Sequence, residues 1–131
     1  MESVVLQVDI PEGSTLRYTT DGTAPSATNG YTSSDGTFSV SATTVYRFML
    51  LQKGMLPSPV VTRSYIYRNH DYYLPIVSIA TNRANLYDGT IGVYTDGNNG
   101  ISGRNHGPSN INMDWERPVN FENPDDVTSR I

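Results

Sequence analysis

The sequence predicts a mainly β protein, with a small β-sandwich followed by a short β-rich segment that holds at most one helical turn. Apolar and polar residues alternate with a period of two in several short runs of the first half, as in half-buried strands. Turn-forming pairs such as Asp21-Gly22 and Lys53-Gly54 separate these runs. No helical periodicity accompanies them, and short strands spaced this closely favour a sandwich over a βαβ unit.

Five strands are expected in the first half of the chain. They cover residues 4–9, 16–21, 38–42, 44–51 and 60–67. Residues 24–36 are rich in Pro, Ser, Thr, Asn and Gly, which predicts an irregular connecting loop. Within the strands, six apolar residues are predicted to form the core: Leu16, Tyr18, Val40, Tyr46, Phe48 and Tyr65.

The alternating pattern breaks at R-N-H-D-Y-Y, residues 68–73, and we place a domain boundary there, between residues 1–68 and 69–131. The second segment is expected to contain strands at residues 75–81, 93–94 and 115–122, one helical turn capped by Asn82, a turn at Asp88-Gly89 and a long loop over residues 95–112.

Composition excludes several classes of function. The chain has no Cys, so it has no disulfide scaffold, CxxC zinc site or thiol nucleophile. Its net charge is −4 and it lacks a basic run, so a nucleic acid partner is not expected. No apolar stretch approaches the roughly 20 residues that span a bilayer. The start M-E-S-V-V-L is not a signal peptide and the end D-V-T-S-R-I has no closing element, so we interpret the chain as an internal piece of a longer protein.

No catalytic or cofactor-binding residue is predicted. His70 and His106 stand 36 positions apart, and neither lies in a nucleophile-elbow or HExxH pattern. Asp114 and Glu116 would share one face of a strand, where a solvent-facing row is favoured over a pair of glycosidase acids. The glycines of residues 92–103 lack the Lys-Ser/Thr of a phosphate loop.

A metal site is not assigned either. Asp96, Asn98 and Gly100 in D-G-N-N-G resemble part of a calcium loop, because hard cations prefer several oxygen ligands. An EF-hand would need Glu at the twelfth position, and residue 107 is Gly. An Asx-rich turn is therefore favoured, and calcium binding by this loop stays open.

Aromatic residues are the candidates for ligand contact. Nine Tyr and one Trp offer flat faces for stacking on sugar rings, although Tyr also packs readily in a small β core with its hydroxyl in water. The candidate stacking residues are Tyr65 and Tyr67 on one strand face, Tyr72 and Tyr73 at the boundary, and Trp115.

Two motifs carry family resemblances. The run L-R-Y-T-T-D-G-T-A-P at residues 16–25, with Tyr31, Tyr46 and S-P-V-V-T-R-S-Y at residues 58–65, resembles the chitobiase/β-hexosaminidase C-terminal type of module over about residues 3–67. This resemblance implies a small immunoglobulin-like sandwich, of a kind appended to exported bacterial proteins that often act on polysaccharides.

The second segment resembles the opening of the spore-coat CotH family. The matching runs are L-P-I-V-S-I-A-T-N-R-A-N-L-Y-D at residues 74–88, G-V-Y-T at residues 92–95 and W-E-R-P-V-N-F-E at residues 115–122. CotH proteins are implied to be kinase-like phosphotransferases, but their Gly-rich segment and their metal- and ATP-contacting acids are absent, so no catalytic residue is carried over. The loop N-N-G-I-S-G-R-N-H-G-P-S-N is longer than the family's usual link.

Together these observations predict a non-catalytic accessory module, without a cofactor, in an extracellular or cell-surface bacterial protein. Its expected partners are other domains of the same polypeptide, which it would position. The alternatives are a carbohydrate-binding module with a polysaccharide partner and the lobe edge of a kinase-like phosphotransferase. Exposed strand edges would also allow two copies to pair as a dimer.

Overall fold

A computed structural model describes residues 3–68, 73–103 and 107–123. The chain divides into two compact units, one formed by residues up to Ala80 together with those from Asn120 onward, and the other by Thr81–Val119. The described residues form ten strands, one five-residue helix and one 3-10 turn, so the mainly β prediction is confirmed. None of the helices in these residues has the length and apolarity to cross a bilayer.

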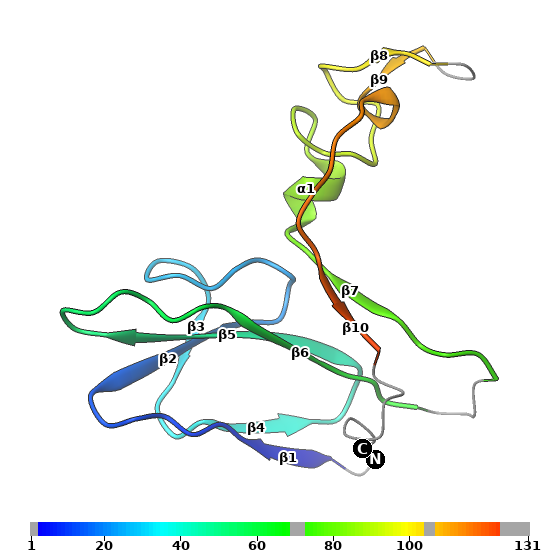
Figure 1. Cartoon of the computed structure of the whole chain (residues 1–131). Helices are drawn as coiled ribbons and strands as arrows, with labels where there is room; N and C mark the ends of the chain where they lie inside the picture. The colour runs from blue at the N-terminus through cyan, green and yellow to red at the C-terminus, as the bar shows by residue number, and fades with distance from the viewer. Residues whose placement is uncertain (1–2, 69–72, 104–106, 124–131) are drawn as a thin grey trace. The chain divides into compact units, whose positions relative to one another are not determined.

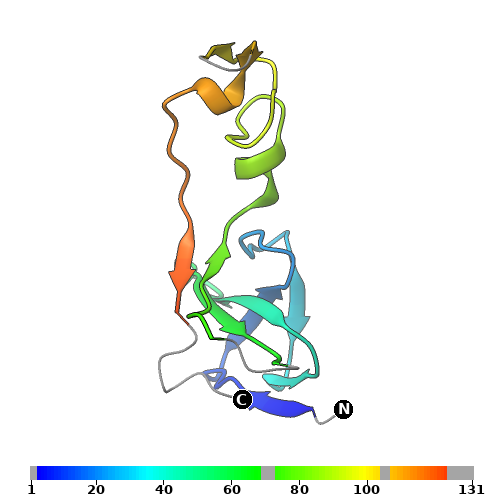
Figure 2. The same cartoon turned by 90° about the vertical axis from the view of Figure 1, so that its right-hand side faces the viewer.

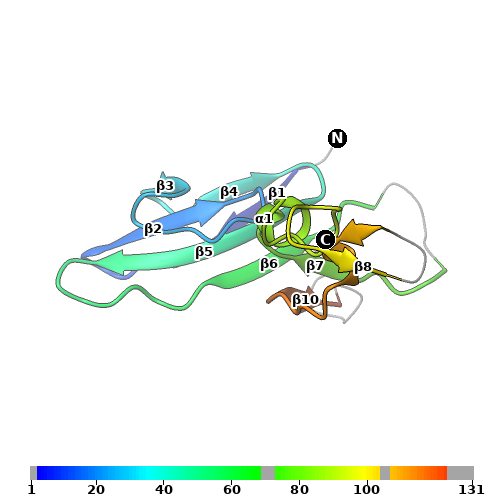
Figure 3. The same cartoon turned by 90° about the horizontal axis from the view of Figure 1, so that it is seen from above.

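The first unit contains two antiparallel layers (Figures 1 and 2). The larger sheet has four strands in the order β3 (Tyr31–Ser33), β2 (Ser14–Thr19), β5 (Thr44–Gln52) and β6 (Val61–Tyr65). Facing it, β1 (Val4–Gln7) pairs with β4 (Thr37–Val40). Viewed from above, β2, β5 and β6 run side by side (Figure 3). This arrangement is the small β-sandwich that the alternation predicts.

Turns or bends follow the strands where the sequence predicts them. Gly22 has φ 84°, a left-handed conformation that only Gly adopts without strain. The Asp21 carboxylate accepts hydrogen bonds from the Thr23 N–H at 3.0 Å and the Thr23 hydroxyl at 2.6 Å. Because these bonds stabilise the charged form, they lower the pKa of Asp21. The chain therefore changes direction at Asp21-Gly22, as predicted.

An aromatic core lies between the two layers. Leu16, Val40, Tyr46 and Phe48 are buried as predicted, while Tyr18 and Tyr65 are partly buried against them. Phe38 of β4 belongs to the same buried cluster but was left out of the prediction; its ring centroid lies 4.9 Å from that of Tyr18 and 5.3 Å from those of Tyr46 and Phe48. Such ring pairs contribute about 0.5–1.5 kcal/mol each beyond their buried area.

The connecting loop predicted at residues 24–36 is more ordered than expected. It contains β3, which pairs with β2. Arg17 of β2 donates to the carbonyls of Ser26 and Gly30 at 3.1 and 2.9 Å, and Arg47 of β5 donates to the Gly22 carbonyl at 2.8 Å. The prediction of irregular structure was wrong for residues 31–33, because pairing with a neighbouring strand outweighs weak local propensity.

Two strands of the second predicted segment belong to the first unit. β7 (Ser78–Ala80) and β10 (Asn120–Glu122) pair antiparallel, and both are shorter than the predicted strands 75–81 and 115–122. The buried Ser64 of β6 lies 2.6 Å from the Ser78 hydroxyl and donates to Glu122 at 2.6 Å. Residues 69–72 lie outside the described chain, and the boundary at residue 68 stays a prediction.

The second unit begins with the helix α1 (Arg83–Tyr87). The Asn82 side chain caps it by accepting from the Ala84 N–H at 3.0 Å, which confirms the predicted cap. The strand predicted at residues 93–94 is absent. Instead, the N–H groups of Val93 and Tyr94 donate to the carbonyls of Asn85 and Leu86 at 3.0 and 2.8 Å, so this segment satisfies helix carbonyls that would otherwise lack partners.

The long loop predicted over residues 95–112 contains the short pair β8 (Ile101–Ser102) and β9 (Pro108–Ser109) and the 3-10 turn η1 (Asn110–Asn112). The fully buried Asn110 organises it. Its amide donates to the carbonyls of Gly89 and Gly92 at 3.0 and 3.1 Å, and its oxygen accepts from the Asn99 N–H at 3.1 Å. A Cβ atom on Gly97 would clash with this amide, which explains the small residue there.

Candidate functional site

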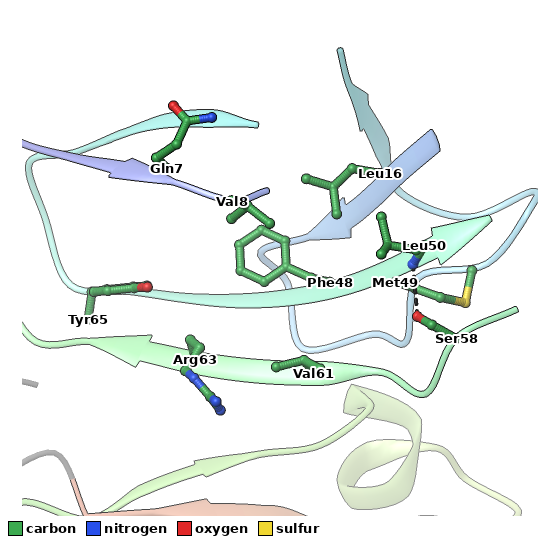
Figure 4. Close-up of a pocket in the computed structure, with 10 residues that line it drawn as sticks. All are labelled: Gln7, Val8, Leu16, Phe48, Met49, Leu50, Ser58, Val61, Arg63 and Tyr65. Carbon is green, nitrogen blue, oxygen red and sulfur yellow. Dashed lines mark hydrogen bonds between the residues drawn. The ribbon is translucent and has the colours of Figure 1, made fainter. Parts of the chain in front are cut away.

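The first unit has a cavity of about 280 Å³ on the inner face of the larger sheet (Figure 4). It lies between the end of β1 and the strands β5 and β6. Ten residues line it: Gln7, Val8, Leu16, Phe48, Met49, Leu50, Ser58, Val61, Arg63 and Tyr65.

Strand register explains why this cavity exists. Phe48 is opposite Val61, and Thr44 is opposite Tyr65, so alternate residues of β5 and β6 point to the same face as the core. The layer that covers this face has two strands where the larger sheet has four. Part of the inner face at β6 therefore remains open, and Val61 is 45% exposed.

Most polar groups of the cavity are already bonded. The Ser58 hydroxyl accepts from the Leu50 N–H at 2.9 Å and donates to the Pro59 carbonyl at 3.0 Å. The Gln7 amide donates to the Asp35 carbonyl at 2.7 Å and accepts from the Thr37 hydroxyl at 3.0 Å. These side chains support the wall of the cavity and have little hydrogen-bonding capacity left for a ligand.

Arg63 and Tyr65 supply the remaining polar groups. Arg63 is exposed and donates from Nη1 to the Thr62 carbonyl at 2.8 Å. The ring of Tyr65 packs edge-on against Tyr46, with centroids 6.0 Å apart. Burial raises the pKa of Tyr65, the positive charge of Arg63 lowers it, and the negative charge of Glu122 raises it further. The phenol is therefore neutral and can donate a hydrogen bond at neutral pH.

The predicted stacking residues lie in different settings. Tyr65 lines the cavity, Tyr67 is 40% exposed with its N–H bonded to Thr43, and Tyr73 is fully exposed. Tyr72 lies outside the described residues. Trp115 belongs to the second unit, half-buried, with the Arg117 guanidinium 5.0 Å from its ring centroid. A stacking role for these five residues stays a prediction.

Tyr31, which belongs to the family resemblance but is not among the predicted stacking residues, is an exposed aromatic residue. It is 65% exposed on the edge strand β3, and its ring lies 5.5 Å from that of Tyr18, which packs on the core. A ring held in this way offers one face to a ligand. The strand β3 that contains Tyr31 was not predicted because the surrounding stretch is rich in Gly, Ser and Thr, although the Y-T-S pattern after Gly30 is a weak strand signal.

The other candidates from the sequence form no reactive cluster among the described residues. Asp114 and Glu116 are exposed outside regular structure, so the expectation that they share a strand face was wrong. The Asp96 carboxylate lies 3.3 Å from the Ser109 hydroxyl, which donates to it. His70 and His106 lie outside the described residues. No group of three or more His, Asp and Glu side chains suited to a metal occurs in residues 3–68, 73–103 and 107–123.

The two layers and their aromatic core define the N-terminal part of the chain as a small β-sandwich module. The family model of the chitobiase/beta-hexosaminidase C-terminal domain matches residues 2–62, fewer than half of the 131 residues. This match supports the first of the two resemblances. It does not reach the segment that resembles CotH, which stays a prediction. No match is found among curated proteins or among solved structures.

Proposed function

We propose that the chain is a non-catalytic accessory module of an exported bacterial protein, in which the sandwich positions a CotH-like domain whose first strands lie in the second segment. The protein would act outside the cell or on its surface. The match of residues 2–62 to a carbohydrate-associated accessory domain supports the accessory role.

The observation that carries the positioning role is the hydrogen-bonded contact between β6 and the β7–β10 pair. A module that holds a neighbouring domain needs a fixed connection to it. Ser78 and Glu122 belong to the two runs that resemble CotH, and both are bonded to the same buried residue, Ser64. Glu122 stands 58 residues away from Ser64 in the chain, so this contact joins distant segments.

Amide hydrogen exchange on the purified chain tests this role. We expect the N–H groups that pair β7 with β10 to be protected, and to exchange faster in Ser64→Ala while those between β2 and β5 change little. Ser39→Ala, on the exposed side of β4, is the matched control and should leave both sets unchanged. Unchanged exchange of β7 and β10 in Ser64→Ala would mean that the sandwich does not hold them.

A carbohydrate-binding role is the second candidate, and Tyr31 favours it. The exposed Tyr31 ring is fixed against Tyr18, and a preformed aromatic face binds sugars with little loss of conformational entropy. A pull-down on insoluble polysaccharides, chitin included, should retain the chain, and Tyr31→Ala should release it while Tyr73→Ala does not. Absence of retention on all polysaccharides would reject this candidate.

The third candidate, the lobe edge of a phosphotransferase, depends on sequence beyond Ile131. If the parent protein continues there with CotH motifs, its Gly-rich and acidic segments would supply the phosphoryl-transfer chemistry, and residues 69–131 would form the edge of that lobe. A continuation without these motifs would reject the CotH part of the proposal and leave the sandwich as an accessory module.

A further inference from the structure

We propose that the cavity between β1 and β6 binds a small amphipathic carboxylate, with an aromatic ring inside the cavity and the carboxylate at Arg63 on its rim. This site is separate from the positioning role and from the exposed face of Tyr31. The size of the cavity, its lining and the position of its charge favour this class of ligand.

The size fits one ring with a short arm. The cavity measures about 280 Å³. An apolar cavity of about 150 Å³ holds a benzene molecule, and pockets for drug-sized ligands begin at about 300 Å³. The cavity at β6 therefore has room for a ring and two or three further atoms, and is small for an oligosaccharide.

The lining favours an apolar group. Val8, Leu16, Phe48, Leu50 and Val61 contribute aliphatic and aromatic surface (Figure 4). A sugar ring placed here would lose many hydrogen bonds to water and could regain few, because the nearby Ser58 and Gln7 groups are bonded within the protein and, among the lining residues, only Arg63 and Tyr65 offer donors. An aromatic ring has no such polar groups to satisfy.

The charge on the rim favours a carboxylate. Arg63 donates from one guanidinium nitrogen to the neutral Thr62 carbonyl, and within the described ranges no carboxylate pairs with it. Glu122 is bonded to Ser64, which the alternation of β6 places on the opposite face of the sheet. The guanidinium therefore keeps free donors, and its planar fork matches the two oxygens of a carboxylate. Tyr65 follows Arg63 by two positions in β6, so it lies on the same face of the sheet.

Titration of the ¹⁵N-labelled chain with 3-phenylpropionate tests the site. The expected result is saturable shifts in the amide signals of β5, β6 and Val8. The neutral analogue 3-phenylpropanamide should shift the same signals with about three- to fivefold weaker affinity, the factor of an exposed charge pair. Shifts spread over other parts of the chain, or no saturable shifts, would overturn the proposal.

Two variants test separately how the charge of Arg63 and the volume of the cavity contribute to ligand binding. Arg63→Gln should bring 3-phenylpropionate to the affinity of the amide and leave the amide unaffected, while Lys53→Gln, an equal loss of charge in an exposed turn, should change neither. Val61→Phe fills the cavity from the exposed edge and should abolish binding of both probes while the melting temperature stays close to that of the wild type. Equal affinity for acid and amide in the wild type, or binding that survives in a folded Val61→Phe variant, would refute the assignment.

Discussion

The hydrogen bond between Ser64 and Glu122 gives the sharpest prediction about how the two segments are joined. Ser64 has one hydroxyl proton, which it donates to the Glu122 carboxylate at 2.6 Å, so Ser78 donates its own proton to Ser64. Ser64 is 5% exposed, and an O–H···O⁻ bond of this length belongs to the strong class. Removal of either partner should therefore loosen the attachment of β10 to β6.

The magnitude follows from the charge and the burial. Hydrogen bonds to charged groups contribute about 1.5–3 kcal/mol to stability, and the partly exposed Glu122 places this bond at the lower end. Ser64→Ala should lower the free energy of unfolding by more than Glu122→Ala does, because it also removes the hydrogen-bond partner of Ser78. In a double-mutant cycle of Ser64→Ala and Glu122→Ala we expect a coupling free energy of about 1–2 kcal/mol.

Urea unfolding of the wild type, the two single variants and the double variant measures this coupling. Glu116→Ala, an exposed carboxylate in the second unit, replaces Glu122→Ala in a control cycle that should give no coupling. If the effects of Ser64→Ala and Glu122→Ala add within about 0.3–0.5 kcal/mol, the two side chains do not interact in solution, and this hydrogen bond does not attach β10 to β6.

Three further predictions concern the core, the second unit and acid stability. Phe38→Ala should lower the free energy of unfolding of the sandwich by about 3–5 kcal/mol in urea titrations, and a loss below 1 kcal/mol would contradict its central place. Asn110→Ala removes three hydrogen bonds, to the Gly89 and Gly92 carbonyls and from the Asn99 N–H, and should speed amide exchange across the second unit, whereas Asn98→Ala, which is exposed, should not. The hydrogen bonds from Thr23 lower the pKa of Asp21 in the folded state, so they stabilise the fold at pH values above the unfolded-state pKa of Asp21. This stabilisation is lost as the pH falls through the folded-state pKa. Melting temperatures of Asp21→Asn should therefore fall less than those of the wild type below about pH 4, and parallel curves would contradict this.

Much of the sandwich could be predicted from the sequence, because its information is local. The alternation of Leu16 with Arg17 and of Tyr46 with Arg47 marks which side chains face the core, and Gly22 fixes a turn through its own backbone. The strand β3 could not be predicted in this way. Tyr31 gains its extended conformation from pairing with Tyr18, a contact across an intervening loop.

In the second unit, too, contacts between distant residues decide local structure, and local sequence does not predict them. Val93 and Tyr94 have high β propensity, yet their N–H groups bond to carbonyls of α1. The Asn- and Gly-rich stretch has the composition of a loose loop, yet buried polar side chains such as Asn110 and Ser109 bond its backbone. The pattern gives no sign of which asparagine is buried.

The cavity illustrates why sites are harder to predict than strands. Tyr65 was identified as an aromatic on a strand, but its place beside Arg63 and Val61 on one wall follows from the register of β5 with β6 and from the unequal widths of the two layers. Neither quantity can be read from one run of residues. Tyr31 was missed for the same reason, since its exposure depends on its edge position.

The proposal that the chain is a non-catalytic accessory module can be tested by assaying the purified chain for turnover of a chromogenic N-acetylglucosaminide and for phosphotransfer from labelled ATP. We expect no product above the protein-free blank with either substrate. Product that forms in proportion to protein concentration, and that persists through a second purification step, would contradict it.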